Sequence, residues 1–327
     1  MSWDLKVAEI QKPYLTDKDI WQSVHRFYYH GKTTTTYKYG FLKALLESVP
    51  SANEQFEISF DHLFYSFTKI YWNLVIHNNL CQSNSQKAPS SVQKVLEAFA
   101  ATHAIPREWS FDQLPASQQL QLIAAVKKVG KKYVIGATYS DFNGEIYSFD
   151  LKKEYLQLHP TYYRFFQTHK RMLTNITNYQ LALFLEKFNE AEKVSKLLTR
   201  VEVVTQRKSL LQFSQLLQKA GIEHCFYCHK KISKSSHVDH FIPWSYIQSD
   251  HLWNFVLSCS TCNTRKNNKL AAENFLQQLI TRNNQWIKEE RYLLQFENYT
   301  EKKLTEFYQY SQLNGFIHDW KPSQLRE

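Results

Sequence analysis

The C-terminal part of the chain contains two cysteine pairs, Cys225-Phe-Tyr-Cys228 and Cys259-Ser-Thr-Cys262, which enclose a polar segment. Val238-Asp239-His240-Phe241-Ile242-Pro243-Trp244 and Trp253-Asn254 stand between the two pairs, and Asn263-Thr-Arg-Lys266 follows the second. Each Cys-x-x-Cys pair can fold into a knuckle that points two sulfur atoms at one ion, so the two pairs predict a four-cysteine zinc site. Four thiolates leave no open position for water, which makes this zinc structural.

The distance between the two cysteine pairs is unusual. Thirty residues separate Cys228 from Cys259, whereas zinc ribbons have roughly 15–20. The insert contains polar residues of its own. Asp239 and His240 stand in a strand-like run that Pro243 ends. Asn263 is expected to begin a helix that continues with Leu270, Phe275, Leu276 and Leu279.

These polar residues suggest a reaction as well as a metal. Carboxylate and amide oxygens, as on Asp239 and Asn263, suit a hard ion such as Mg²⁺. A neutral imidazole, as on His240, suits proton abstraction from water.

Taken together, residues 225–270 resemble the HNH endonuclease motif, the ββα-metal fold, in its zinc-braced four-cysteine form. The resemblance implies that His240 is the general base, and that Asp239 and Asn263 bind the catalytic ion. It implies that Asn254 holds the loop between the two strands through hydrogen bonds. Asparagine at position 263, where some members have histidine, makes Mg²⁺ or Mn²⁺ the expected catalytic metal.

The resemblance also implies DNA as the partner and phosphodiester hydrolysis as the reaction. Lys266, three residues after Asn263, is expected to contact a phosphate, together with Arg265 and Lys269. Lys230, Lys231 and Lys234 add positive charge near the motif, and such lysines give affinity without sequence information.

The first 200 residues predict a mostly helical domain. Thr16 and Asp19 have the spacing of a helix-capping pair, and apolar residues recur at helical intervals in several later segments. The expected helices cover 37–49, 59–80, 92–103 and 116–129, and further helices run from Pro160 to about Lys219. One β-hairpin is expected from 133–139 and 145–149, because Asn143-Gly144 suits a type I′ turn. The predicted class is therefore α+β.

The chain is long enough for two domains, predicted at 1–205 and 206–327. The first would read the DNA target, regulate the nuclease or bind a partner protein. Lys127, Lys128, Lys131 and Lys132 precede the expected hairpin, and are either a solvated face or part of a DNA-contacting wing. Cys81 is interpreted as a free thiol.

Composition limits the remaining possibilities. The 40 Lys and Arg against 30 Asp and Glu give a net charge of +10, which permits a polyanionic partner. No apolar run is long enough for a membrane helix, and the first residues lack the pattern of a signal peptide. A soluble, cytoplasmic protein with reduced cysteines is expected.

Two functions remain in competition at this point. The first is a metal-dependent DNA endonuclease, favoured for a restriction or anti-phage role by analogy with compact stand-alone nucleases. The second is a non-catalytic zinc module that binds nucleic acid or a partner protein. Asp239, His240 and Asn263 favour the first, because zinc binding requires none of them.

Overall fold

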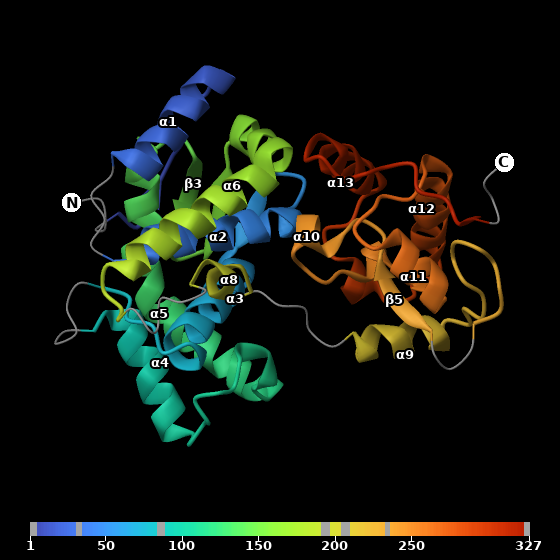
Figure 1. The fold of residues 1–327 in the computed structure, drawn as a ribbon. Coiled ribbons are helices and arrows are strands. Elements are labelled where there is room, and N and C mark those ends of the chain that lie inside the picture. The colour runs from blue at the N-terminus through green and yellow to red at the C-terminus, as the bar shows by residue number, and fades with distance from the viewer. Residues whose placement is uncertain are drawn as a thin grey trace. The chain divides into compact units, whose positions relative to one another are not determined.

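The computed structural model describes residues 5–30, 35–83, 89–190, 197–203, 210–232 and 236–323. It is mostly helical with small sheets, as the sequence predicts (Figure 1). Two compact units are present, and each has its own hydrophobic core. The first contains residues 1–166 and 170–206, and the second contains residues 167–169 and 207–327. The predicted boundary at 205/206 lies outside the described residues, so it stays a prediction.

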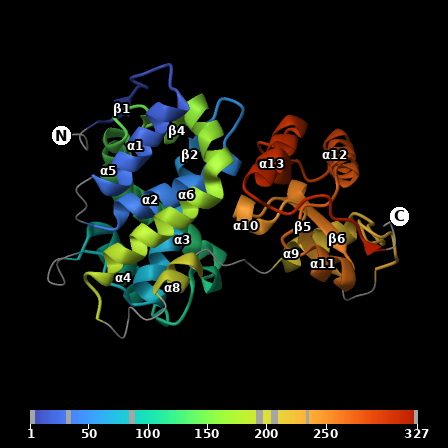
Figure 2. The ribbon, with the colours of Figure 1, turned by 45° about the horizontal axis from the view of Figure 1, so that its top comes forward.

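The first unit is built mainly from helices (Figure 2). Its hydrophobic core is rich in aromatic residues. Its described helices are α1 (Asp17–Tyr29), α2 (Tyr37–Ser48), α3 (Phe60–Trp72), α4 (Ser91–Thr102), α5 (Ala116–Asp141), α6 (Pro160–Glu186) and α8 (Leu197–Val203). A π-helical turn, Asn73–His77, follows α3. The predicted capping pair is present: Thr16 Oγ1 accepts from the Asp19 amide, and the Asp19 carboxylate accepts from the Thr16 amide.

A four-stranded antiparallel sheet completes this unit, in the order β1 (Val7–Ala8), β3 (Tyr147–Asp150), β4 (Tyr155–Leu158), β2 (Glu57–Ser59). Within the described part of the chain, a tight hairpin is formed by β3 and β4, with a turn over residues 151–154. The prediction that residues 133–139 form its first strand is wrong.

Residues 133–139 belong instead to the long helix α5. Their β-branched and aromatic side chains favour a strand locally, but packing against α3 overrides that preference. Gly130 permits the close approach, because a Cβ atom there would lie 2.8 Å from Phe64 Cε1. Asn143 and Gly144 do adopt the positive φ angles expected of them, 54° and 73°, but they follow the end of α5.

The lysines of α5 form ion pairs within this unit. Lys127 binds both Asp61 and Glu154, and Lys131 binds Glu154 from one helical turn further on. Lys128 and Lys132 are exposed. Because α5 is one continuous helix here, a wing built from these residues and the expected hairpin is wrong. The solvated-face interpretation fits Lys128 and Lys132, whereas Lys127 and Lys131 are engaged in ion pairs.

The second unit places a two-stranded antiparallel sheet among short helices. The sheet pairs β5 (His237–His240) with β6 (Phe255–Ser258). Its described helices are α9 (Leu211–Lys219), α10 (Trp244–Ile247), α11 (Ser260–Lys266), α12 (Glu273–Lys288) and α13 (Glu301–Leu313). The core of this unit includes Tyr227, Phe255, Phe275 and Phe307. Thus β5, β6 and α11 form a ββα unit, with α10 in the connection between the two strands.

The helix near Asn263 differs in two ways from the expectation. It begins at Ser260, because the Cys259 side chain caps it by accepting from the Cys262 amide. It also ends at Lys266, where Asn267 adopts a φ of 46°. The apolar residues from Phe275 onward therefore belong to a separate helix, α12.

Among the described residues, no helix is both long enough and apolar enough to cross a membrane.

Candidate nuclease site with a zinc knuckle

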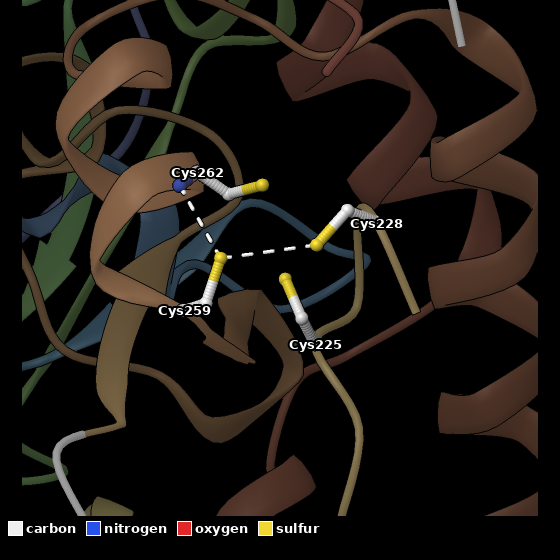
Figure 3. Close-up of side chains that lie close together, drawn as sticks. All are labelled: Cys225, Cys228, Cys259 and Cys262. Atoms are coloured by element: carbon white, nitrogen blue, oxygen red, sulfur yellow. Dashed lines mark hydrogen bonds between the residues drawn. The ribbon is translucent and has the colours of Figure 1, made fainter. Parts of the chain in front are cut away.

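The four cysteines of the two pairs converge on one point (Figure 3). All four sulfur atoms lie within 4.8 Å of one another, and the Sγ atoms of Cys228 and Cys259 are 3.8 Å apart. A zinc ion with four thiolates at about 2.3 Å places neighbouring sulfurs about 3.8 Å apart. The cluster therefore fits a structural zinc ion. Within the described ranges it is the one group of three or more His, Cys, Asp and Glu side chains close enough to hold an ion.

The environment of the thiols explains why they need a cation. Burial raises the pKa of Cys225, and burial together with the neighbouring Cys225 raises the pKa of Cys262. Four thiolates this close would repel one another, whereas a divalent ion would stabilise all four. A divalent ion bound here would therefore stabilise the folded arrangement of the four cysteines.

Backbone contacts tie the first cysteine knuckle to the sheet. The Cys225 amide donates to the Lys230 carbonyl, and the His229 amide donates to the Cys225 carbonyl, which closes the turn. The Phe226 amide donates to the Leu257 carbonyl in β6. The second knuckle leads from β6 directly into α11. Zinc would thus clamp both knuckles at one end of the ββα unit.

Asn254 fixes the loop that follows His240, as expected. Its side chain is fully buried, accepts from the Ile242 amide at 2.8 Å and donates to the Ile242 carbonyl at 2.9 Å. The backbone carbonyl of Asn254 accepts a hydrogen bond from the Phe241 amide at 2.8 Å. Buried backbone groups are costly to leave without partners, so Asn254 contributes to the shape of this loop.

Helix α12 holds the other side of the same loop. Arg282 donates to the carbonyls of Leu252 and Phe255, and Asn283 donates to the Trp253 carbonyl at 2.9 Å. Three carbonyls around Asn254 are therefore bonded to one helix.

His240 occupies the end of β5 and is 3% exposed. Its Nε2 lies 2.9 Å from Asp250 Oδ1, and the ring packs edge-on against Phe255, its partner across the sheet. The backbone carbonyl of His240 accepts from Lys266 Nζ at 2.8 Å. Backbone and ring are both held.

Asp239 is also buried, and two groups bind the same oxygen of its carboxylate. Tyr227 donates to Oδ2 at 2.6 Å, and Lys266 Nζ lies 2.9 Å from it. Burial, and then the nearby Asp239 charge, raise the pKa of Tyr227 well above its ordinary value, so the phenol remains a donor. Tyr227 lies inside the first knuckle, which connects the zinc site directly to Asp239.

Lys266 does not lie where the sequence predicts. Its side chain is fully buried between Asp239 and the His240 carbonyl, so a phosphate contact does not fit this structure. Arg265 is exposed and donates to Ser323, and the half-buried Lys269 donates to the Arg265 carbonyl. Lys230 and Lys231 are exposed on the first knuckle, and Lys234 lies outside the described residues.

Asn263 is half-buried, one helical turn before Lys266 on the same face of α11. Because Lys266 binds β5, this face is directed toward the strand that carries Asp239 and His240. The oxygen donors suit a hard cation. Tyr227 and Lys266 both contact Oδ2 of Asp239, which leaves Oδ1 as the oxygen that could bind the ion, and Asn263 could add an amide oxygen.

Two residues of the site could not be identified from the sequence. Asp250 stands ten residues after His240 in an irregular loop, where no spacing rule points to it. Tyr227 is part of the Cys225-Phe-Tyr-Cys228 knuckle, where an aromatic residue indicates only packing around zinc.

Comparison with known families agrees with this geometry. Residues 225–269 match the family model described as HNH endonuclease. No curated protein and no solved structure matches the chain.

Proposed function

We propose that the protein is a metal-dependent endonuclease that hydrolyses phosphodiester bonds of DNA. The match of residues 225–269 to the HNH family model, together with the four-cysteine cluster, supports a nuclease-type function for the second unit. The observation that carries the proposal is a buried His240 held between Asp250, Phe255 and Lys266, next to Asp239. A zinc-binding module would need the four cysteines, but none of these contacts.

The proposed reaction begins with a water molecule beside His240. The imidazole takes one proton from the water, and the remaining electron pair of the oxygen attacks phosphorus. The bond from phosphorus to the 3′ oxygen then breaks, and its electrons leave with that oxygen. Asp239 Oδ1 and Asn263 would hold Mg²⁺ or Mn²⁺. When bound, such an ion stabilises negative charge on the phosphate and on the leaving oxygen.

The roles of the other residues follow from their positions. Asn254 keeps the loop after His240 in place, and Lys266 acts as a buried counter-charge for Asp239. Arg265, Lys269, Lys230 and Lys231 are cations near the motif that could contact the DNA backbone.

One contact favours the second candidate function, a zinc module without activity. Lys266 neutralises Asp239 at 2.9 Å, which lowers the attraction of this carboxylate for a divalent cation. A requirement for a second metal ion would distinguish the endonuclease from the inactive zinc module.

Cleavage is expected to need added Mg²⁺ or Mn²⁺ even when one zinc ion per chain is present, because a closed site of four thiolates has no position for water or phosphate. The measurement is plasmid nicking after chelation and desalting, with each metal titrated back and zinc determined by elemental analysis. Full cleavage with zinc alone would contradict a separate catalytic ion, and no cleavage with any metal on any DNA would favour the zinc module.

We also propose a role in bacterial restriction or anti-phage defence, in the cytoplasm, with the first unit reading DNA or binding a partner. This part of the proposal rests on analogy with compact nucleases that carry a separate helical domain. Expression of the protein should lower plaque formation by at least one phage in a diverse panel, and His240→Ala should restore it. Equal plaque numbers with and without the protein across the panel would argue against the role.

A further inference from the structure

The contact between His240 and Asp250 determines which ring nitrogen carries the hydrogen. Nε2 of His240 lies 2.9 Å from Asp250 Oδ1, and the side chains are 3% and 18% exposed. An ionised carboxylate can only accept hydrogen bonds, so the hydrogen of a neutral imidazole must be on Nε2. The lone pair of the ring is then on Nδ1.

The residues on both sides of Asp250 make contacts of their own. Gln248 ends α10 in a left-handed conformation, with a φ of 60°, and its amide donates to the Trp244 carbonyl. Ser249 Oγ lies 2.8 Å from His251 Nε2, and the His251 ring stacks on Trp253 at 4.7 Å. The backbone that carries Asp250 therefore lies between two segments with defined contacts.

The ring of His240 packs in a T-shaped arrangement against Phe255, and Lys266 holds the backbone carbonyl of His240. A half-turn about χ2 would exchange each ring nitrogen with a carbon atom. The bond to Asp250 distinguishes these two orientations, because only one of them brings a nitrogen to the carboxylate.

We propose that Asp250 is the positioning residue for His240, and that Nδ1 of His240 is therefore the atom that takes the proton from water. The inference rests on the proposed nuclease function. Asp250 selects the ring orientation and the tautomer before the reaction. As the proton reaches Nδ1 the ring becomes positive, and the carboxylate at 2.9 Å stabilises that charge.

Three substitutions test the role of Asp250. Asp250→Ala removes the acceptor. Asp250→Asn introduces an amide that can donate to Nε2, which would place the hydrogen on Nδ1. Both are expected to lower kcat about 100-fold or more, with KM for DNA changed less than about threefold. Asp250→Glu keeps the carboxylate and should recover part of the lost rate.

The chain offers a matched control. His318 Nδ1 and Asp319 Oδ2 form a second histidine–aspartate pair at 2.6 Å in the same unit, with both side chains exposed. Asp319→Asn makes the same chemical change as Asp250→Asn, and is expected to leave kcat, zinc content and the melting temperature unchanged.

Nitrogen-15 NMR of the histidine rings reports the tautomer without any cleavage assay. In the full-length zinc-loaded protein, His240 should carry its hydrogen on Nε2, with the signal assigned by its loss in His240→Asn. In Asp250→Ala the ring should populate both tautomers. A tautomer that is unchanged by Asp250→Ala would overturn the proposal.

The two assays together separate the possible failures. A wild-type protein that cleaves DNA, with Asp250→Ala equally active, overturns the role of Asp250 alone. Parallel loss of kcat, DNA binding and melting temperature would make Asp250 structural, and would also overturn it. Absence of cleavage in every protein, wild type included, would overturn the nuclease function, while the NMR measurement would still judge the contact between Asp250 and His240.

Discussion

Substitution of His240 by alanine is expected to lower DNA cleavage by about 10²–10⁴-fold, because it removes the group that accepts the proton from water. Binding of DNA should persist, since His240 is buried and the exposed cations of the unit remain. The measurement is the rate of plasmid nicking at saturating Mg²⁺ or Mn²⁺, beside a DNA-binding titration without added metal.

Alanine also leaves a void against Phe255 and removes the partner of Asp250. Some loss of stability is therefore expected in addition to loss of chemistry. His240→Asn is the better-matched variant: its amide can still donate to Asp250 but cannot serve as a base. Near-normal cleavage by a well-folded asparagine variant would remove His240 from the mechanism.

The short-range parts of the candidate site could be predicted because their chemistry is local. Two Cys-x-x-Cys pairs can point sulfur atoms at one ion in almost any context, and the structure brings all four together. Asn254 likewise makes the loop contacts expected of it. The catalytic roles of His240, Asp239 and Asn263 stay predictions.

Residues whose role depends on distant packing could not be predicted. Lys266 follows Asn263 by three residues, which places both on one face of α11. Whether that face meets DNA or the buried Asp239 depends on the approach of α11 to β5. The position of Asp250 depends in the same way on the path of the loop between α10 and β6, and the sequence of that loop has no periodic pattern.

The wrong prediction of a strand at residues 133–139, in the first unit, has a related cause. The segment 133–139 is rich in β-branched and aromatic residues, and Asn143-Gly144 follows it, so local preference favours a hairpin. In the structure Val134, Ile135 and Thr138 are buried along one helix, α5. Burial of this face is a tertiary effect, and it outweighs a local preference of about 1 kcal/mol.

Replacement of one zinc ligand should produce a different failure from the loss of His240. In Cys228→Ser or Cys259→Ser, zinc would retain three thiolates, and the clamp between the first knuckle and α11 would weaken. Structural zinc contributes about 10–16 kcal/mol in small zinc-binding peptides, so loss of a ligand is expected to destabilise the two knuckles. Elemental analysis should therefore find less than one zinc per chain.

Loss of the clamp should reach the proposed catalytic residues through Tyr227. This residue lies between Cys225 and Cys228 and donates to Asp239 at 2.6 Å, so disorder in the knuckle removes a hydrogen bond from Asp239. Proteolysis between Gly221 and Leu270 should become faster, and cleavage of DNA should be lost as a consequence. The first unit should stay folded, because the four cysteines are absent from its hydrophobic core.

Cys81→Ser provides the control for these variants, since Cys81 belongs to the first unit and lies outside the four-cysteine cluster. It should retain zinc, protease resistance and cleavage. Limited proteolysis with mass spectrometry locates the segment that opens, and circular dichroism follows the helices of the first unit. A Cys228 or Cys259 variant that keeps its zinc and its protease resistance, yet no longer cleaves DNA, would mean that the cysteines take part in the chemistry. The structural assignment of the zinc would then be wrong, because a structural zinc ion can affect the reaction only by stabilising the fold.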